Sequence, residues 1–257
     1  MSKPRLAVWF SCGAASAVTA KLCLEQMADT HEIAIARCIV ANEHPDNDRF
    51  CADCERWFGQ EIIRLRSRFF RTCEDVWRLH NFILSGKGAS PCTKKMKKAV
   101  RKDFELQYNP DVQAFGFTLE ERERATFFRK HNPKVQLLTP LIDTYLTKPD
   151  CLHMIQKAGI DLPQMYKLGF NNNNCIGCPK GGKGYWNRIR THFPDVFNRM
   201  AALEREINAT VFKKDGEKYF LDQLRPDEGR HDEPKIDCSL FCWSESEEME
   251  AGRGVRA

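Results

Sequence analysis

The stretch RLAVWFSCGAAS (residues 5–16) decides the fold of this 257-residue chain. Residues 5–10 form an apolar run typical of a buried strand, and residues 16–27 have the pattern of a helix. The small residues between them let backbone N–H groups converge on an anion at the start of that helix. No Gly-Lys-Ser/Thr ends the loop, so it is not a Walker loop. The stretch predicts a strand, a phosphate-binding loop and a helix, with a purely structural turn as the alternative.

The segments that follow alternate between strand and helix patterns. The apolar runs predict further strands at residues 32–40, 61–66, 112–117 and 135–138. Helices are expected at residues 47–58, 73–84, 92–106, 148–159, 185–193 and 194–208, and a small hairpin at 210–221. Such alternation predicts an α/β fold, a mostly parallel sheet with helices on both faces, followed by a helical C-terminal part. Ligands of these sheets bind at the carboxyl ends of the strands.

Composition favours a folded protein without membrane spans. Apolar residues make up 42% of the chain, and no apolar run approaches the roughly 20 residues of a transmembrane helix. The start of the sequence lacks a signal-peptide pattern, so a cytoplasmic location is expected, in the host cytoplasm if a phage encodes the chain. We expect a nucleotide-binding domain over residues 1–225 and a flexible charged tail over residues 226–257.

A second motif, NCIGCPKGGK (residues 174–183), contains two cysteines three positions apart. Cys175 and Cys178 can direct their sulfurs at one metal, and Gly177 relieves the crowding of such a turn. The neighbouring lysines favour the thiolate form of the cysteines. Half of a zinc knuckle, a redox pair and an iron–sulfur segment all have this spacing.

The sequence contains twelve cysteines, which are expected to be reduced in an intracellular protein. Four of them lie in apolar helix or strand patterns and are expected to be simple core residues: Cys23, Cys38, Cys73 and Cys151. Cys51 and Cys54 form another CxxC, within a predicted amphipathic helix, with metal binding as the alternative. The cysteines that remain as candidates for chemistry are Cys92, Cys175, Cys178, Cys238 and Cys242.

The net charge is +5, and the basic residues are clustered. Six of them lie between residues 94 and 102, directly after Cys92, and four arginines lie between residues 64 and 71. These stretches indicate either solvated helix faces or an anion-binding surface for nucleotide phosphates or a nucleic-acid backbone.

The first loop resembles the Ser-Gly-Gly-x-x-Ser loop of adenine-nucleotide α-hydrolases, the PP-loop ATP pyrophosphatases. Over residues 5–225 the chain resembles the phosphoadenosine phosphosulfate (PAPS) reductase-like branch of that superfamily, in the form found in phage genomes. The supporting stretches are NEHPDNDRF (42–50), PCTK (91–94), GFTLEERERA (116–125), PLID (140–143) and the CxxC. Cys12 replaces the usual Gly, and Ala15 replaces the Asp of many ATP-using members. The Glu-Cys-Gly-x-His motif of PAPS reductases is missing, and its nearest echo is KIDCSLFC (235–242).

This resemblance implies a metal centre. Cys92, Cys175 and Cys178 would hold a [4Fe-4S] cluster, and three protein ligands leave one iron open for the sulfur that is transferred. Cys238 or Cys242 would be either a fourth ligand or a mobile catalytic thiol. Zinc is the structural alternative because cysteines suit it equally well. A metal-free protein is the third reading.

The resemblance also assigns a nucleotide site for ATP or PAPS. Its expected residues are Ser11, Cys12, Gly13, Ala14 and Ser16, with His44 and Asp46 as candidates that position Mg²⁺ or ribose. The last two are equally typical of loop caps. Arg122 and Arg124 would neutralise charge that develops in the reaction, or form an ion-paired helix surface.

Three functions compete on this basis. The first is an ATP-dependent sulfurtransferase that thiolates a nucleic acid. The second is a reductase of PAPS or adenylyl sulfate that releases sulfite through a tail cysteine. The third is a non-enzymatic nucleic-acid-binding module with structural zinc. The expected partners are an adenine nucleotide, a nucleic-acid substrate and a sulfur donor or thioredoxin-like reductant. A homodimer is the candidate assembly, and no membrane is involved.

Overall fold

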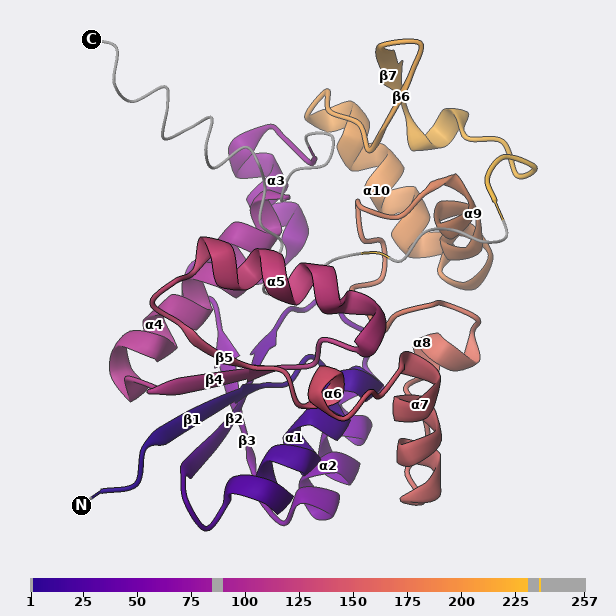
Figure 1. Ribbon diagram of the computed structural model, residues 1–257. Helices are drawn as coiled ribbons and strands as arrows, with labels where there is room; N and C mark the ends of the chain where they lie inside the picture. Colours follow the sequence, from indigo (N-terminus) through magenta and orange to yellow (C-terminus); the bar gives the residue numbers. More distant parts are fainter. Residues whose placement is uncertain (1, 85–89, 231–235, 237–257) are drawn as a thin grey trace, which may run out of the picture. The chain divides into compact units, whose positions relative to one another are not determined.

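The apolar run at the start of the chain forms the central strand of a five-stranded parallel sheet in a computed structural model of the protein (Figure 1). The strand order is β3-β2-β1-β4-β5, the order of the first five strands in doubly wound sheets. In the register, Ala7 of β1 pairs with Ala34 of β2 and with Gln113 of β4. The predicted α/β fold with a mostly parallel sheet is confirmed.

The structure describes residues 2–84, 90–230 and 236, so Cys238 and Cys242 lie outside the described residues. The chain divides into two units. The first contains the sheet and consists of residues up to 39, residues 45–66 and residues 100–167. The second consists of residues 40–44, the described part of 67–99, and the described residues from 168 onward.

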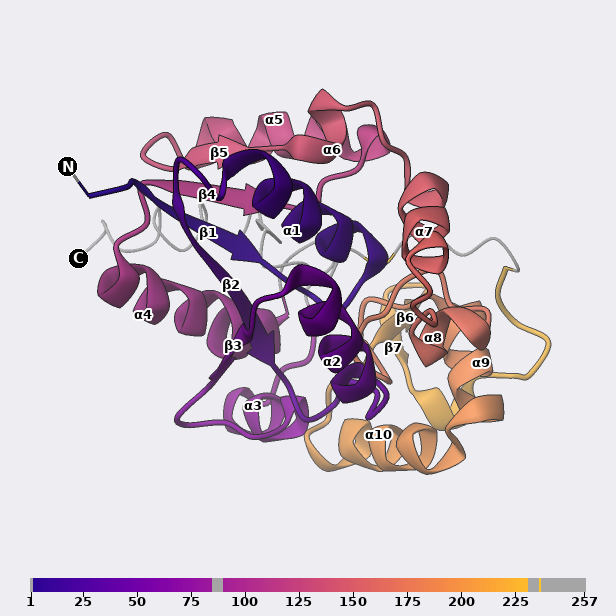
Figure 2. The same ribbon diagram turned by 90° about the horizontal axis from the view of Figure 1, so that it is seen from below.

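The first unit has helices on both faces of its sheet. Helices α1 and α2 cover one face, and α4 and α5 cover the other (Figure 1, Figure 2). The elements of this unit are β1 (Arg5–Trp9), α1 (Ala14–Met27), β2 (Glu32–Ile39), α2 (Asn47–Phe58), β3 (Ile62–Arg66), α4 (Ala99–Tyr108), β4 (Val112–Phe115), α5 (Arg122–His131), β5 (Gln136–Leu138), α6 (Pro140–Asp143), α7 (Lys148–Lys157) and α8 (Gln164–Lys167).

Side-chain alternation along β1 explains why both faces are covered. Leu6 and Val8 belong to a core cluster that includes residues of α1 and α2. Trp9 points to the other face, where its ring meets Phe104 of α4 edge-on at a centroid distance of 5.7 Å. Because successive strand residues face opposite sides, a strand that is apolar at every position is buried on both.

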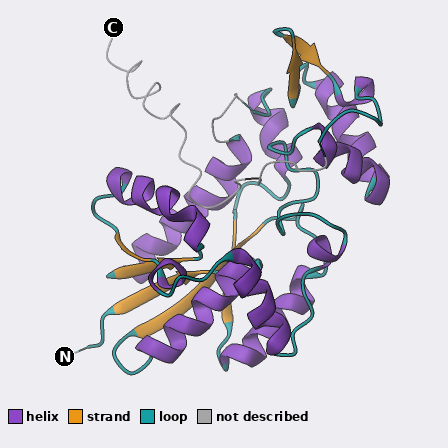
Figure 3. Ribbon diagram, turned by 45° about the vertical axis from the view of Figure 1, so that its right-hand side comes forward, coloured by secondary structure: helices purple, strands orange, loops and turns teal. Residues whose placement is uncertain are grey.

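The second unit is mainly helical and carries a small antiparallel hairpin (Figure 3). Its elements are α3 (Cys73–His80), a π-helical turn (Thr93–Lys98), α9 (Lys183–His192), α10 (Pro194–Glu206), β6 (Phe212–Lys214) and β7 (Glu217–Tyr219). A capping box between Thr72 and Asp75 starts α3, because each side chain accepts a hydrogen bond from the other residue's backbone N–H. The predicted C-terminal helices and hairpin are confirmed.

One predicted helix differs in detail, and another helix lies where no helix range was predicted. The helix expected from residue 92 begins as a π-helical turn before it continues as α4. The Glu/Arg-rich segment forms helix α5, after a capping box between Thr118 and Glu121. None of the helices in the described part of the chain is long and apolar enough to span a membrane.

Candidate functional site

The loop between β1 and α1 has the backbone geometry of an anion-binding turn. Cys12 has φ +57°, in the left-handed region, and Gly13 is extended at the N-cap of α1. The first helical hydrogen bond runs from the Ala17 N–H to the Gly13 carbonyl, so the preceding N–H groups lie at the helix start without a helical acceptor. Such N–H groups, together with the helix dipole, attract phosphate.

Ser16 organises this loop from inside. Its buried Oγ accepts hydrogen bonds from the Ser11 N–H at 3.0 Å and the Ser11 Oγ at 3.1 Å. It donates to the Gly13 carbonyl at 2.9 Å. The Ser11 side chain is exposed. The two serines therefore differ in role: Ser11 is available to a ligand, and Ser16 holds the loop in shape.

We expect Ser16→Ala to weaken ATP binding about tenfold. The change removes the acceptor of the Ser11 N–H and the donor to the Gly13 carbonyl, a loss of roughly 1–3 kcal/mol of local stabilisation, and tenfold in affinity corresponds to about 1.4 kcal/mol. Isothermal titration calorimetry with ATP measures the effect. Thr19→Val is the matched control, since Thr19 lies buried in the same helix and its hydroxyl has no hydrogen-bond partner among the described residues. Equal affinities of the two variants would contradict this role of Ser16.

Gly116 and Tyr166 lie beside the loop and were not among the predicted site residues. A Cβ at Gly116, directly after β4, would lie 2.8 Å from the Ser16 nitrogen and 2.9 Å from the Ala15 carbonyl carbon. A Cβ at Gly13 would lie 3.3 Å from the Tyr166 hydroxyl. The loop is thus packed tightly against the end of β4, and Tyr166 presents a hydroxyl beside it. The sequence could have indicated Gly116, because it is a glycine at the carboxyl end of a predicted strand, the end where ligands of such sheets bind.

Cys12 takes part in the loop through its backbone only. Its side chain is fully buried, and its sulfur lies 3.6 Å from the Cys51 sulfur in α2. The left-handed conformation is the one that glycine adopts most easily, which accounts for the glycine expected there from the resemblance. Here a cysteine adopts this left-handed conformation, and its sulfur contacts Cys51 of α2.

Asp46 and His44 have packing partners. The Asp46 carboxylate binds the Arg49 guanidinium at 2.6 and 2.8 Å and accepts a hydrogen bond from the Gln164 N–H at 2.8 Å. It therefore joins the start of α2 to α8. The His44 ring lies edge-on to the Phe193 ring, with centroids 5.8 Å apart, within the second unit.

Arg122 and Arg124 begin helix α5 in different environments. Arg124 forms an ion pair with Glu121, and its guanidinium lies over the Phe117 ring at 5.5 Å. The Arg122 side chain is exposed. Of the two, Arg122 is the one more available to an anionic ligand.

The basic stretch after Cys92 is only partly exposed. Lys97 forms an ion pair with Glu43 at 3.4 Å. Arg101 is buried, which lowers its pKa, and it pairs with Glu105 at 3.0 Å. Lys95 and Lys102 are exposed. The stretch as a whole is therefore not one continuous cationic surface.

The second unit brings together three cysteines from separate segments. Cys73 lies at the start of α3, Cys92 precedes the π-helical turn, and Cys175 begins the CxxC. Hydrogen-bond contacts with Cys175 and Cys92, together with complete burial, raise the pKa of the Cys73 thiol well above its ordinary value. We call Cys73, Cys92 and Cys175 the cysteine trio. Cys73 is buried, as expected of a core residue, and its neighbours include two further thiols.

Polar contacts hold the three segments of the trio in place. The Asn42 side-chain oxygen accepts from the Cys73 N–H at 2.8 Å, and its carbonyl accepts from the Ile176 N–H at 2.8 Å. The Cys92 thiol donates to the Ser90 hydroxyl at 3.1 Å, and that hydroxyl accepts from the Trp77 indole of α3 at 3.0 Å. The trio is thus fixed to α3 and to the loop that contains Asn42.

The CxxC turn has its own support. The Tyr185 hydroxyl accepts from the Cys178 N–H at 2.9 Å and donates to the Cys175 carbonyl at 3.0 Å. Gly177 has φ +77°, and a Cβ there would lie 3.0 Å from the Val196 side chain. Both observations agree with the tight turn predicted for this motif.

The donor set of this region fits a thiolate-ligated metal. The ten described cysteines are all free of disulfides and buried, and the trio and Cys178 supply sulfur ligands typical of zinc and iron–sulfur centres. Among the described residues, however, no three or more Cys, His, Asp or Glu side chains are arranged as a metal site. The thiols of the trio and Cys178 would have to reorient to coordinate one.

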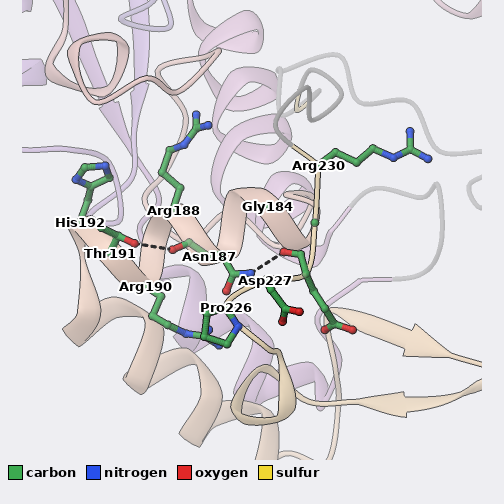
Figure 4. Close-up of a pocket in the computed structure, with 11 residues that line it drawn as sticks. Gly184, Asn187, Arg188, Arg190, Thr191, His192, Pro226, Asp227 and Arg230 are labelled. Atoms are coloured by element: carbon green, nitrogen blue, oxygen red, sulfur yellow. Dashed lines mark hydrogen bonds between the residues drawn. The ribbon is translucent and has the colours of Figure 1, made fainter.

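A surface pocket of about 400 Å³ lies in the second unit between α9 and residues 226–230 (Figure 4). The Asn187 side chain joins its two walls by donating to the Glu228 carbonyl at 2.6 Å. Arg188 donates to the Gly169 carbonyl, and Arg190 donates to the Leu224 carbonyl at 2.5 Å. These two arginines therefore stabilise the fold of the unit.

Comparison with known proteins gives distant similarities. No family model matches the sequence. An uncharacterized protein of Methanocaldococcus jannaschii is 26% identical over 211 residues, which are 79% of this chain and 42% of that protein. The chain thus spans less than half the length of this relative.

Two solved structures are similar to this one. The first is a PAPS reductase from Candida auris in its phosphate complex, with a TM-score of 0.47 and 8% identity; the match covers 67% of this chain and 81% of that one. The second is the U34-tRNA thiolase NcsA from Methanococcus maripaludis with its [4Fe-4S] cluster, with a TM-score of 0.46 and 13% identity; the match covers 80% of this chain and 72% of that one. Both identities are below 25%, so the similarity is one of fold alone.

Proposed function

We propose that the protein is a nucleotide-activating sulfur-transfer enzyme of the PAPS reductase-like type that thiolates a nucleic acid in an ATP-dependent reaction. One observation carries the proposal: three buried thiols meet in one unit of a chain whose other unit has a phosphate-type loop at the carboxyl end of its central strand. Neither part alone indicates this chemistry. A phosphate loop serves many nucleotide enzymes, and buried thiols serve many metal proteins.

The loop residues would bind and orient the nucleotide. The N–H groups at the start of α1 and the exposed Ser11 hydroxyl would hold its phosphates, while Ser16 keeps the loop in shape. Arg122 would stabilise negative charge that develops when an acceptor oxygen attacks the α-phosphate and pyrophosphate leaves. A sulfur nucleophile then replaces AMP on the activated atom.

The cysteine trio and Cys178 would hold the metal centre. A [4Fe-4S] cluster supplies, when bound, the sulfur-binding and redox-active centre of such a reaction. The chain's own contribution is to bury the thiols and fix their segments through Asn42, Ser90 and Tyr185. Cys238 and Cys242 stay candidates for a mobile thiol, or for a ligand that replaces one of these four.

Anaerobic purification tests this proposal first. We expect a brown protein with iron and acid-labile sulfide, and ATP-dependent release of pyrophosphate that requires a nucleic-acid acceptor. Colourless protein that contains zinc and no iron would contradict the cluster. Sulfite release from PAPS with thioredoxin would instead establish the reductase alternative. Zinc without any nucleotide turnover would leave the nucleic-acid-binding module.

A further inference from the structure

Two thiols meet directly beneath the phosphate-binding loop. The Cys12 sulfur, from the loop itself, lies 3.6 Å from the Cys51 sulfur of α2. Both side chains are fully buried. The CxxC that contains Cys51 lies on a helix, as predicted. The thiol that contacts Cys51 is that of Cys12, not that of Cys54 in the same motif.

A buried arginine is directed at this pair. The Arg37 guanidinium, 2% exposed on β2, donates a hydrogen bond to the Cys51 sulfur at 3.1 Å. Arg37 also contacts the Asp48 carboxylate at 3.5 Å. The positive charge directed at the Cys51 sulfur favours the thiolate form of Cys51.

The surroundings of Cys51 favour that thiolate near neutral pH. The hydrogen bond from Cys12 and the positive charges of Arg37 on β2 and Arg64 on β3 lower the pKa of Cys51 to about 7, against the opposing effect of burial. Cys54, one turn further along the same helix, is equally buried, and burial raises its pKa. The two cysteines of this CxxC therefore differ in reactivity, since the thiolate is the nucleophile.

We propose that Cys12 and Cys51 form a redox-active dithiol, a modification site at which hydroperoxides convert the phosphate-binding loop into a disulfide-linked form. The Cys51 thiolate attacks the O–O bond of hydrogen peroxide and becomes a sulfenic acid as hydroxide leaves. The Cys12 thiol then attacks the Cys51 sulfur, and water leaves as the disulfide forms. In total, two thiols lose two electrons and two protons, and the peroxide is reduced to two waters.

Disulfide formation has to move the loop. The sulfur–sulfur distance must fall from 3.6 Å to the roughly 2.05 Å of a disulfide. Cys12 is one residue before Gly13, the N-cap of α1, so its displacement disturbs the N–H groups that would receive phosphate. Nucleotide binding and oxidation should therefore oppose each other, and by thermodynamic linkage each weakens the other equally. This inference depends on nucleotide binding by the loop and not on sulfur transfer.

Peroxide treatment of the full chain, with and without ATP, tests the inference. Alkylation of the remaining thiols and peptide mass spectrometry should find a Cys12–Cys51 linked peptide that dithiothreitol reverses. Cys23 and Cys54 serve as internal controls and should stay alkylatable after denaturation. Because disulfide formation has to move the loop, ATP at about 100 times its dissociation constant should slow disulfide formation about 100-fold.

Variants separate this chemistry from nonspecific oxidation. Cys12→Ala should raise the pH at which Cys51 reacts with a maleimide, because it removes the hydrogen bond to the thiolate, while Cys54→Ala should leave that pH profile unchanged. The inference is overturned if no Cys12–Cys51 peptide forms, if Cys54 oxidises as fast as Cys51, or if ATP has no effect on the rate. These readouts need no sulfur-transfer activity, so a failure of the proposed function would be seen separately.

Discussion

Replacing Cys73 by alanine should remove most of the iron and sulfide from the anaerobically prepared protein. Cys73 contacts both Cys92 and Cys175 in the second unit. If Cys73 is a ligand, replacing it should lower the affinity for the metal by more than the roughly 10–100-fold caused by removing a residue that only hydrogen-bonds to a ligand. Iron and acid-labile sulfide per chain, with the visible absorbance of the cluster, measure the loss without any assay of activity.

The matched control for this experiment is Cys23→Ala. Cys23 is as deeply buried, in α1, and burial raises its pKa to about 12, as expected for an inert core thiol. Both variants should lose about 1 kcal/mol of stability, the usual size for a small core change. If Cys73→Ala retains as much iron as Cys23→Ala, Cys73 is not a ligand. If the wild-type protein holds zinc, zinc content replaces iron in the same comparison.

The sequence could not distinguish Cys73 from the other cysteines in apolar patterns. In a helix such as α3 a free cysteine has the same pattern as any small apolar residue. What sets Cys73 apart is its place directly after the capping residue Thr72 and its contact with segments about 20 and 100 residues later in the chain. Contacts of that kind depend on tertiary packing, which the hydrophobic periodicity of a single helix does not reveal.

The fold itself was far more predictable. Each strand of the sheet is a short, mainly apolar run, so hydrophobic periodicity located the five strands and most of the longer helices, but not α5, α6 or α8. The loop between β1 and α1 was located for the same reason, because it joins one apolar strand to one helix, and phosphate binding by it stays a prediction. The roles of Ser11 and Ser16, in contrast, were separated only by the hydrogen bonds that Ser16 makes.

Replacing Gly116 by alanine should weaken the proposed nucleotide binding more than the same change at any other glycine of the first unit. The new Cβ would meet backbone atoms of Ala15 and Ser16 at 2.8–2.9 Å, closer than real Cβ contacts. Backbone cannot rotate away as a side chain can, so the start of α1 must shift. Overpacking of this kind costs roughly 1–3 kcal/mol, and the N–H groups expected to bind phosphate lie on the shifted segment.

We expect Gly116→Ala to lower the melting temperature by about 2–4 °C per kcal/mol lost and to weaken ATP binding more than tenfold. Gly159→Ala is the matched control: Gly159 lies in the same unit at φ +73°, with no atom within 4 Å of the added Cβ. That variant should lose about 1 kcal/mol of stability through backbone strain while its ATP affinity stays at the wild-type value. Calorimetric titration and thermal unfolding compare the two at matched stability. Equal ATP affinities would contradict the role of the β4 end in positioning the phosphate loop, because the clash acts only where Gly116 meets the start of α1.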